Sequence, residues 1–193
     1  MSVISFIVIA IALGISAMML MRRCAEAASL PLSKGLLVSF LFALVHAGLF
    51  CLGLWLGNLL SFESPTDPYA FSRPNAFVFL GMAVVVAVKQ IWPYLGRKTV
   101  PAAYNLNVAT LRVLLFAVAS GINGFLLGMG AGFIAPFVGS FHKAFWPLFI
   151  FVFLLAYLGI MYGRQHVKMR PRRWMAVSSF IILATAIVAV VNS

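Results

Sequence analysis

Residues 120–133 read Ser-Gly-Ile-Asn-Gly-Phe-Leu-Leu-Gly-Met-Gly-Ala-Gly-Phe, an apolar stretch that contains a single amide, Asn123. An amide among glycines and large hydrophobic residues is typical of a helix inside a membrane. A helix through Val113 to Val138 would cross the roughly 30 Å hydrocarbon core, which needs about 20 residues at 1.5 Å each. The glycines recur every three or four residues, so we expect a smooth face for close helix packing, formed by Gly121, Gly124, Gly128 and Gly132.

The composition indicates an integral membrane protein. Hydrophobic residues make up 64% of the chain and charged residues 9%, whereas soluble domains carry about 25% charged residues. The mean hydropathy is +1.09. Lys and Arg number 14 against three acids, for a formal charge of +11. Because the basic residues lie in short connections between apolar runs, they indicate membrane orientation and not nucleic-acid binding.

Six apolar runs predict six membrane-spanning helices in a single all-α membrane domain, residues 1–193. The first run is retained and is not a signal peptide, because its basic residues follow it. A proline-rich stretch, 61–75, separates the second and third runs, and a connection with His142 and Lys143 separates the fourth and fifth. The runs are Val3–Met21, Leu36–Leu60, Ala76–Trp92, Val108–Pro136, Trp146–Tyr162 and Trp174–Val191.

The basic residues predict the orientation. The second and fourth connections between apolar runs contain only two basic residues, Arg73 and Lys143. The positive-inside rule therefore places the odd-numbered connections in the cytoplasm and both termini outside. The odd connections contain Arg22, Arg23, Lys34, Arg97, Lys98, Arg164, Lys168, Arg170, Arg172 and Arg173.

A weak internal repeat relates the two halves of the chain. Gly53 and Gly57 have counterparts in Gly159 and Gly163, and Gly14-Ile15 resembles Gly121-Ile122. With three helices each, the two copies must have opposite orientations, as in many secondary transporters. We expect one repeat at about 1–94, a linker at about 95–107 and a second repeat at about 108–193.

The order of these motifs resembles the MntP family of bacterial manganese efflux pumps, within the LysE superfamily, over nearly the whole chain. The motifs are Leu13-Gly14-Ile15-Ser16-Ala17-Met18-Met19, Phe42-Ala43-Leu44-Val45-His46-Ala47 with Gly53 and Gly57, Ser120-Gly121-Ile122-Asn123-Gly124 with Gly128 and Gly130, and Gly159 and Gly163 followed by Arg164. The resemblance implies a multi-pass protein of the bacterial inner membrane that exports manganese. Two family Asp positions fall here on Met18 and Asn123, and a family Gln falls on His46.

The candidate transport path consists of Asn123, Ser120, Ser16, Met18 and His46, with Asn123 as the candidate metal ligand. The carbonyl oxygen of Asn123 and the two hydroxyls suit a monovalent or partly hydrated divalent cation, although Mn²⁺ prefers carboxylates. A softer metal would instead use His46 and methionine sulfur. In the alternative interpretation, Asn123 bonds a neighbouring helix, worth about 1 kcal/mol, and His46 is a packed core residue.

The remaining glycines, Gly53, Gly57, Gly159 and Gly163, are expected to pack helices within the bundle, with a dimer face as the alternative. No acid pair, catalytic triad or phosphate-binding loop occurs, so we expect no enzyme activity and no cofactor. The predicted function is manganese or other divalent cation efflux by alternating access. The alternatives are a non-transporting membrane subunit without a metal site and an exporter of another small solute. The expected partners are the lipid bilayer and a metal cation substrate, while a homodimer or a membrane-protein partner stays open.

Overall fold

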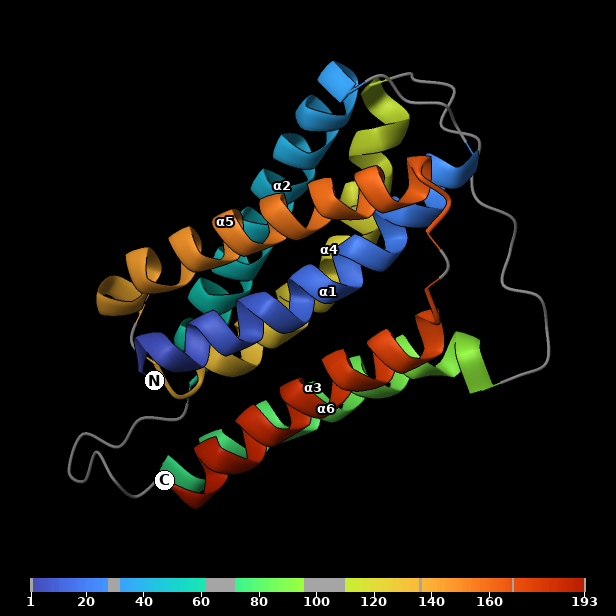
Figure 1. The fold of residues 1–193 in the computed structure, drawn as a ribbon. Coiled ribbons are helices and arrows are strands. Elements are labelled where there is room, and N and C mark those ends of the chain that lie inside the picture. The colour runs from blue at the N-terminus through green and yellow to red at the C-terminus, as the bar shows by residue number, and fades with distance from the viewer. Residues whose placement is uncertain are drawn as a thin grey trace.

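The fold is an all-helical bundle. The computed structural model describes residues 2–27, 32–61, 72–95, 110–135, 137–167 and 169–192. These residues form six helices, and both chain termini lie at the same end of the bundle (Figure 1). The helices are α1 (Val3–Ala27), α2 (Leu32–Leu60), α3 (Ser72–Leu95), α4 (Thr110–Gly132), α5 (Phe137–Arg164) and α6 (Pro171–Val191).

Five helices, α1, α2, α3, α5 and α6, are long and apolar enough to cross a membrane. The described side chains of α4 give a shorter apolar stretch, Ala117–Gly132. A helix satisfies its own backbone hydrogen bonds, and for this reason apolar segments of this length adopt it in lipid. The chain is therefore a multi-pass membrane protein whose outward apolar side chains contact lipid.

The helices pack as a group of four with a pair beside it (Figure 1). In the group, α1 packs against α5, and α2 packs against both α4 and α5. The pair is α3 and α6, which joins the group through contacts of α6 with α1 and of α3 with α4. Phe6, Phe42, Phe50 and Phe79 are fully buried where these helices meet.

Glycines allow the closest helix contacts. At each of six positions, a Cβ atom would lie less than 3.0 Å from a backbone carbonyl oxygen of the neighbouring helix. Glycine is therefore required at these positions for the two helix backbones to lie this close together. The six are Gly53 and Gly57 on α2, Gly128 and Gly132 on α4, and Gly159 and Gly163 on α5.

The boundary between α4 and α5 differs from the prediction. The α4 helix ends at Gly132, and its last turn closes when the Phe133 N–H donates to the Gly130 carbonyl at 3.2 Å. The expectation of one helix from Val113 to Val138 is therefore wrong, since the glycines that allow close packing also weaken helix continuation.

The predicted connection at His142 and Lys143 is also wrong, because both residues lie inside α5. Pro147, in the same helix, removes one backbone hydrogen bond without ending the helix. In a bundle, neighbouring helices and local adjustment can compensate for that loss. The α3 helix begins at Ser72, within the stretch predicted to lie outside the membrane, since proline is tolerated in a first helical turn, as at Pro74. Most of the predicted linker lies outside the described residues, as do Glu63, Asp67, Arg97, Lys98 and Lys168.

Candidate functional site

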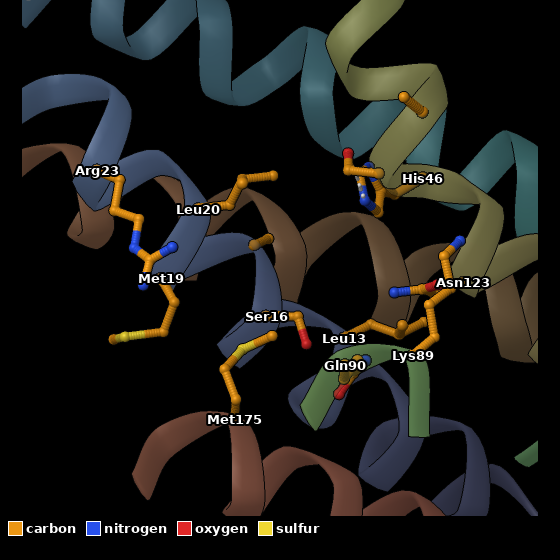
Figure 2. A pocket seen from close by; sticks show the side chains of 13 residues that line it. Leu13, Ser16, Met19, Leu20, Arg23, His46, Lys89, Gln90, Asn123 and Met175 are labelled. Atoms are coloured by element: carbon orange, nitrogen blue, oxygen red, sulfur yellow. Dashed lines mark hydrogen bonds between the residues drawn. The ribbon is translucent and has the colours of Figure 1, made fainter. Parts of the chain in front are cut away.

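A cavity of about 330 Å³ lies between the four-helix group and the α3–α6 pair (Figure 2). Four of the five residues of the candidate transport path line it: Ser16 on α1, His46 on α2, and Ser120 and Asn123 on α4. These residues lie near the middle of their helices. The cavity is therefore at the depth at which a membrane carrier holds its substrate.

Met18, the fifth residue of that path, does not line the cavity. It is 4% exposed, and its backbone carbonyl oxygen lies against Gly159 of α5. Met18 thus belongs to the contact between α1 and α5.

His46 is held in one orientation by its own helix. Its Nδ1 lies 2.9 Å from the carbonyl oxygen of Phe42, and its ring stacks on the Phe42 ring with centroids 4.3 Å apart. A carbonyl oxygen can only accept, so Nδ1 donates, and in the neutral ring Nε2 is an acceptor. The Oγ of Ser120 lies 3.4 Å from Nε2 and donates to the Ala117 carbonyl at 3.0 Å. Gly121 provides room for a neighbour of this ring, since a Cβ there would lie 2.6 Å from Leu49 Cδ1.

Asn123 has an unsatisfied acceptor. Its Oδ1 is buried and has no hydrogen-bond partner within the described structure. A buried polar group without a partner costs about 1–3 kcal/mol, so such a group in a cavity is a candidate for contact with water or a ligand. Gly124, the next residue, faces α2 without the close contact expected of it, because a Cβ there would lie at an ordinary 3.6 Å from the His46 carbonyl oxygen.

A second amide, Gln90 on α3, also lines the cavity and is 3% exposed. The hydroxyls of Ser178 and Ser179 on α6 lie 3.0 and 3.2 Å from its Oε1. Each hydroxyl also lies within hydrogen-bond distance of a backbone carbonyl oxygen, that of Ala12 at 2.8 Å and that of Ala87 at 3.4 Å. The Nε2 of Gln90 is buried and has no partner among the described residues. Ser16 joins the group, because its Oγ lies 3.1 Å from that of Ser178.

Sequence reasoning missed this cluster. A signal was present, because Gln90 is the single amide in the apolar run 76–92, and Ser178 and Ser179 are adjacent in the last run. Only the packing of α3 on α6 shows that they meet.

Two cationic side chains line the cavity, Arg23 on α1 and Lys89 on α3. The sequence explained Arg23 as an orientation signal. In Figure 2, Lys89 lies on the same side of the cavity as Asn123, and Arg23 lies on the other. No Asp or Glu is among the described residues that line the cavity, so its fixed charge is positive.

No three His, Cys, Asp or Glu side chains come together among residues whose positions the structure describes. No protein-family model, curated protein or solved structure matches the chain. The resemblance to the MntP family thus stays a prediction.

Proposed function

We propose that this protein is a small-solute transporter of the bacterial inner membrane, and that the cavity between the four-helix group and the α3–α6 pair is its substrate site. The observation that carries the proposal is the mid-helix position of this cavity together with two unsatisfied amides in its wall. A volume of about 330 Å³ is at the lower end for ligand pockets, which are typically about 300–1,000 Å³. The solute is accordingly small.

The pairing of helices supports two inverted three-helix units as the basis of transport. In two related halves, α1 would correspond to α4, α2 to α5 and α3 to α6. Under this correspondence, the α1–α5 contact is equivalent to the α4–α2 contact, and the α1–α6 contact is equivalent to the α4–α3 contact. The α2–α5 and α3–α6 contacts map onto themselves. Such an exchange is expected of two related halves.

The glycine contacts support the same correspondence. Gly53 meets the carbonyl oxygen of Phe125, and Gly159 meets that of Met18. One turn further along, Gly57 meets Met129 and Gly163 meets Arg22.

This correspondence aligns Met18 with Phe125. Ser16 and Asn123, each two residues earlier, then occupy matching positions, and both line the cavity. The proposed site therefore uses the same position from each repeat.

The proposed mechanism is alternating access, in which the α3–α6 pair rocks against the four-helix group and opens the cavity to each side in turn. Arg23 and Lys89 lie toward the ends of α1 and α3 that, by the positive-inside rule, face the cytoplasm. In the proposed cycle, a solute that is to be exported enters from that side.

Proteoliposomes test the proposal. They would be loaded with labelled malate, glutamine, putrescine and manganese, and release would be followed for the native chain, A119W and V118W. Ala119 lines the cavity and the adjacent Val118 does not, so only A119W should block it. We expect the native chain and V118W to release at least one solute and A119W none. Equal release from all three and from empty liposomes would argue against transport.

Manganese efflux is a second candidate, favoured by the unpartnered carbonyl oxygen of Asn123 in the same cavity as the hydroxyls of Ser16 and Ser120. It requires the cavity to accept a divalent cation without a carboxylate. The test is cellular manganese content, measured by mass spectrometry in a bacterial strain without its own exporter. Native chain, N123A and empty vector would be compared, and this function predicts that only the native chain lowers manganese.

A further inference from the structure

We propose that Phe79 and Met82 on α3, packed against Gly130 on α4, form the outward gate of the transport path, and that α3 leaves α4 here when the cavity opens to the outside. This inference rests on the proposed transport function. It adds the residues that close the path, which the mid-helix position of the cavity does not specify.

The cavity ends near the middle of the helices. Its lining residues lie between the helix middles and the ends assigned to the cytoplasm, from Asn123 on α4 to Arg23 on α1 and Met175 on α6. In the outward half, the side chains between helices are at most 1% exposed and do not line the cavity. They include Phe6 and Ile9 on α1, Phe50 and Leu54 on α2, Phe79 and Ala83 on α3, Leu127 and Ala131 on α4, and Ile182 and Ala186 on α6. The described residues therefore close the cavity on its outward side.

Gly130 brings the backbone of α4 directly onto α3. A Cβ there would lie 2.8 Å from Cδ2 and 3.1 Å from Cα of Phe79, and 3.3 Å from Cβ of Met82. Gly128 and Gly132 face α2 instead, so α4 presents glycine both to the four-helix group and to the α3–α6 pair. Because α4 meets Phe79 at its backbone, rotation of the Phe79 ring does not separate the two helices. The gate opens only if α3 itself moves.

Two contacts join the pair to the four-helix group, and they differ in chemistry. Between α6 and α1 the contact is polar, because Ser178 Oγ lies 2.8 Å from the Ala12 carbonyl oxygen and 3.1 Å from Ser16 Oγ. The outward gate, between α3 and α4, contains no polar side chain. Its separation therefore leaves no side-chain donor or acceptor unpaired, whereas loss of a buried hydrogen bond is costly. The α3–α4 contact is accordingly the one that opens when the pair rocks.

The corresponding position in the first repeat borders the cavity. Gly130 lies five residues after Phe125, and Arg23 lies five residues after Met18, the residue aligned with Phe125. Arg23 lines the cavity, whereas Gly130 is packed against α3. In a carrier built from inverted repeats, equivalent positions that differ in this way mark one open and one closed side. Gly130 therefore marks the closed side.

A disulfide across the gate tests the inference. The position of a Cβ on Gly130 lies 3.3 Å from Met82 Cβ, close to the roughly 3.5–4.5 Å found in disulfides, so M82C and G130C should cross-link on oxidation. The chain would also carry A119C, C24A and C51A. A membrane-impermeant maleimide would be applied from each side of sealed vesicles, and peptide mass spectrometry would identify the labelled residue. After oxidation, A119C should react from the cytoplasmic side only. After reduction, it should react from both sides. A chain with M82C but native Gly130 is the control, and oxidation should not change its labelling.

F79A gives a second variant, which adds no side chain at Gly130. It removes the ring from the closed gate, so A119C should react from the outside at least about tenfold faster than with Phe79 in place. L148A is the matched control, because Leu148 is equally buried but lies on α5, which packs against α1 and α2. This change should leave the outside rate as it was.

The possible results separate this inference from the transport proposal. Reaction of A119C from the outside in F79A, but not with Phe79 in place, would support the gate and contradict alternating access. Reaction from both sides that persists after complete cross-linking would overturn the gate and leave transport standing. The inference would also be overturned by equal outside rates in F79A and L148A, or by failure of M82C and G130C to cross-link in the folded protein.

Discussion

The backbone carbonyl oxygen of Met129 on α4 lies against Gly57 on α2, less than 3.0 Å from the position that a Cβ on this glycine would take. The carbonyl of Met18 stands in the same relation to Gly159 on α5. These contacts fix the distance between helices on both sides of the bundle, and they allow a direct test of the packing.

G57A and G159A should each destabilise the protein by about 1–3 kcal/mol, because the added methyl group meets backbone atoms that cannot turn aside. Thermal unfolding in detergent, followed by tryptophan fluorescence, would measure the change. G81A is the matched control, since nothing lies within 4 Å of a Cβ on that helical glycine. This substitution should be neutral or stabilise by up to about 1 kcal/mol. A loss of thermal stability in G81A equal to that in G57A would contradict the packing argument.

The Gln90 cluster predicts a stability effect between helices. The double change S178A and S179A removes the two hydroxyls that lie between Gln90 Oε1 and the Ala12 and Ala87 carbonyls, and loss of this buried hydrogen-bond network should cost about 1–3 kcal/mol. T185V is the control, because the Thr185 hydroxyl bonds only the Ile181 carbonyl of its own helix, at 2.8 Å. Thermal unfolding would measure both, and an equal change in the two proteins would show that Gln90 does not join α3 to α6.

A carboxylate at Asn123 should change the preference of the cavity. N123D places a negative charge in the cavity that Ser16 and Ser120 also line, and carboxylate oxygens are the ligands that Mn²⁺ prefers. We expect N123D to bind Mn²⁺ more tightly than the native chain, by about tenfold or more, in isothermal titration calorimetry. N192D, at the exposed end of α6, should not differ from the native chain. The same Mn²⁺ affinity in N123D and N192D would place Asn123 outside the cation path.

Much of the fold was predictable because long apolar runs in lipid have few alternatives to helix. The existence of the helices and the packing role of Gly53, Gly57, Gly159 and Gly163 follow from pattern alone. Helix ends were less predictable, and α5 shows the reason. His142 and Lys143 interrupt the apolar pattern, and Pro147 disfavours a helix interior, yet α5 continues through all three.

The candidate site was predictable in part. Ser16, His46, Ser120 and Asn123 are polar residues in the middle of apolar runs, and this placement alone made them candidates for the site. Arg23 and Lys89 lie near helix ends, where orientation alone explains a positive charge, so their place in the cavity could not be inferred. Gln90 required knowledge of which helix faces α6.

The central claim is that one cavity serves both sides of the membrane. A single cysteine at the lining residue Ala119, in a chain carrying C24A and C51A, would be labelled with a membrane-impermeant maleimide from each side of sealed vesicles. N192C and R172C, at opposite ends of α6, would mark the two surfaces. We predict that A119C reacts from both sides, while each control reacts from one. Reaction of A119C from a single side under all conditions, with both controls behaving as expected, would contradict alternating access.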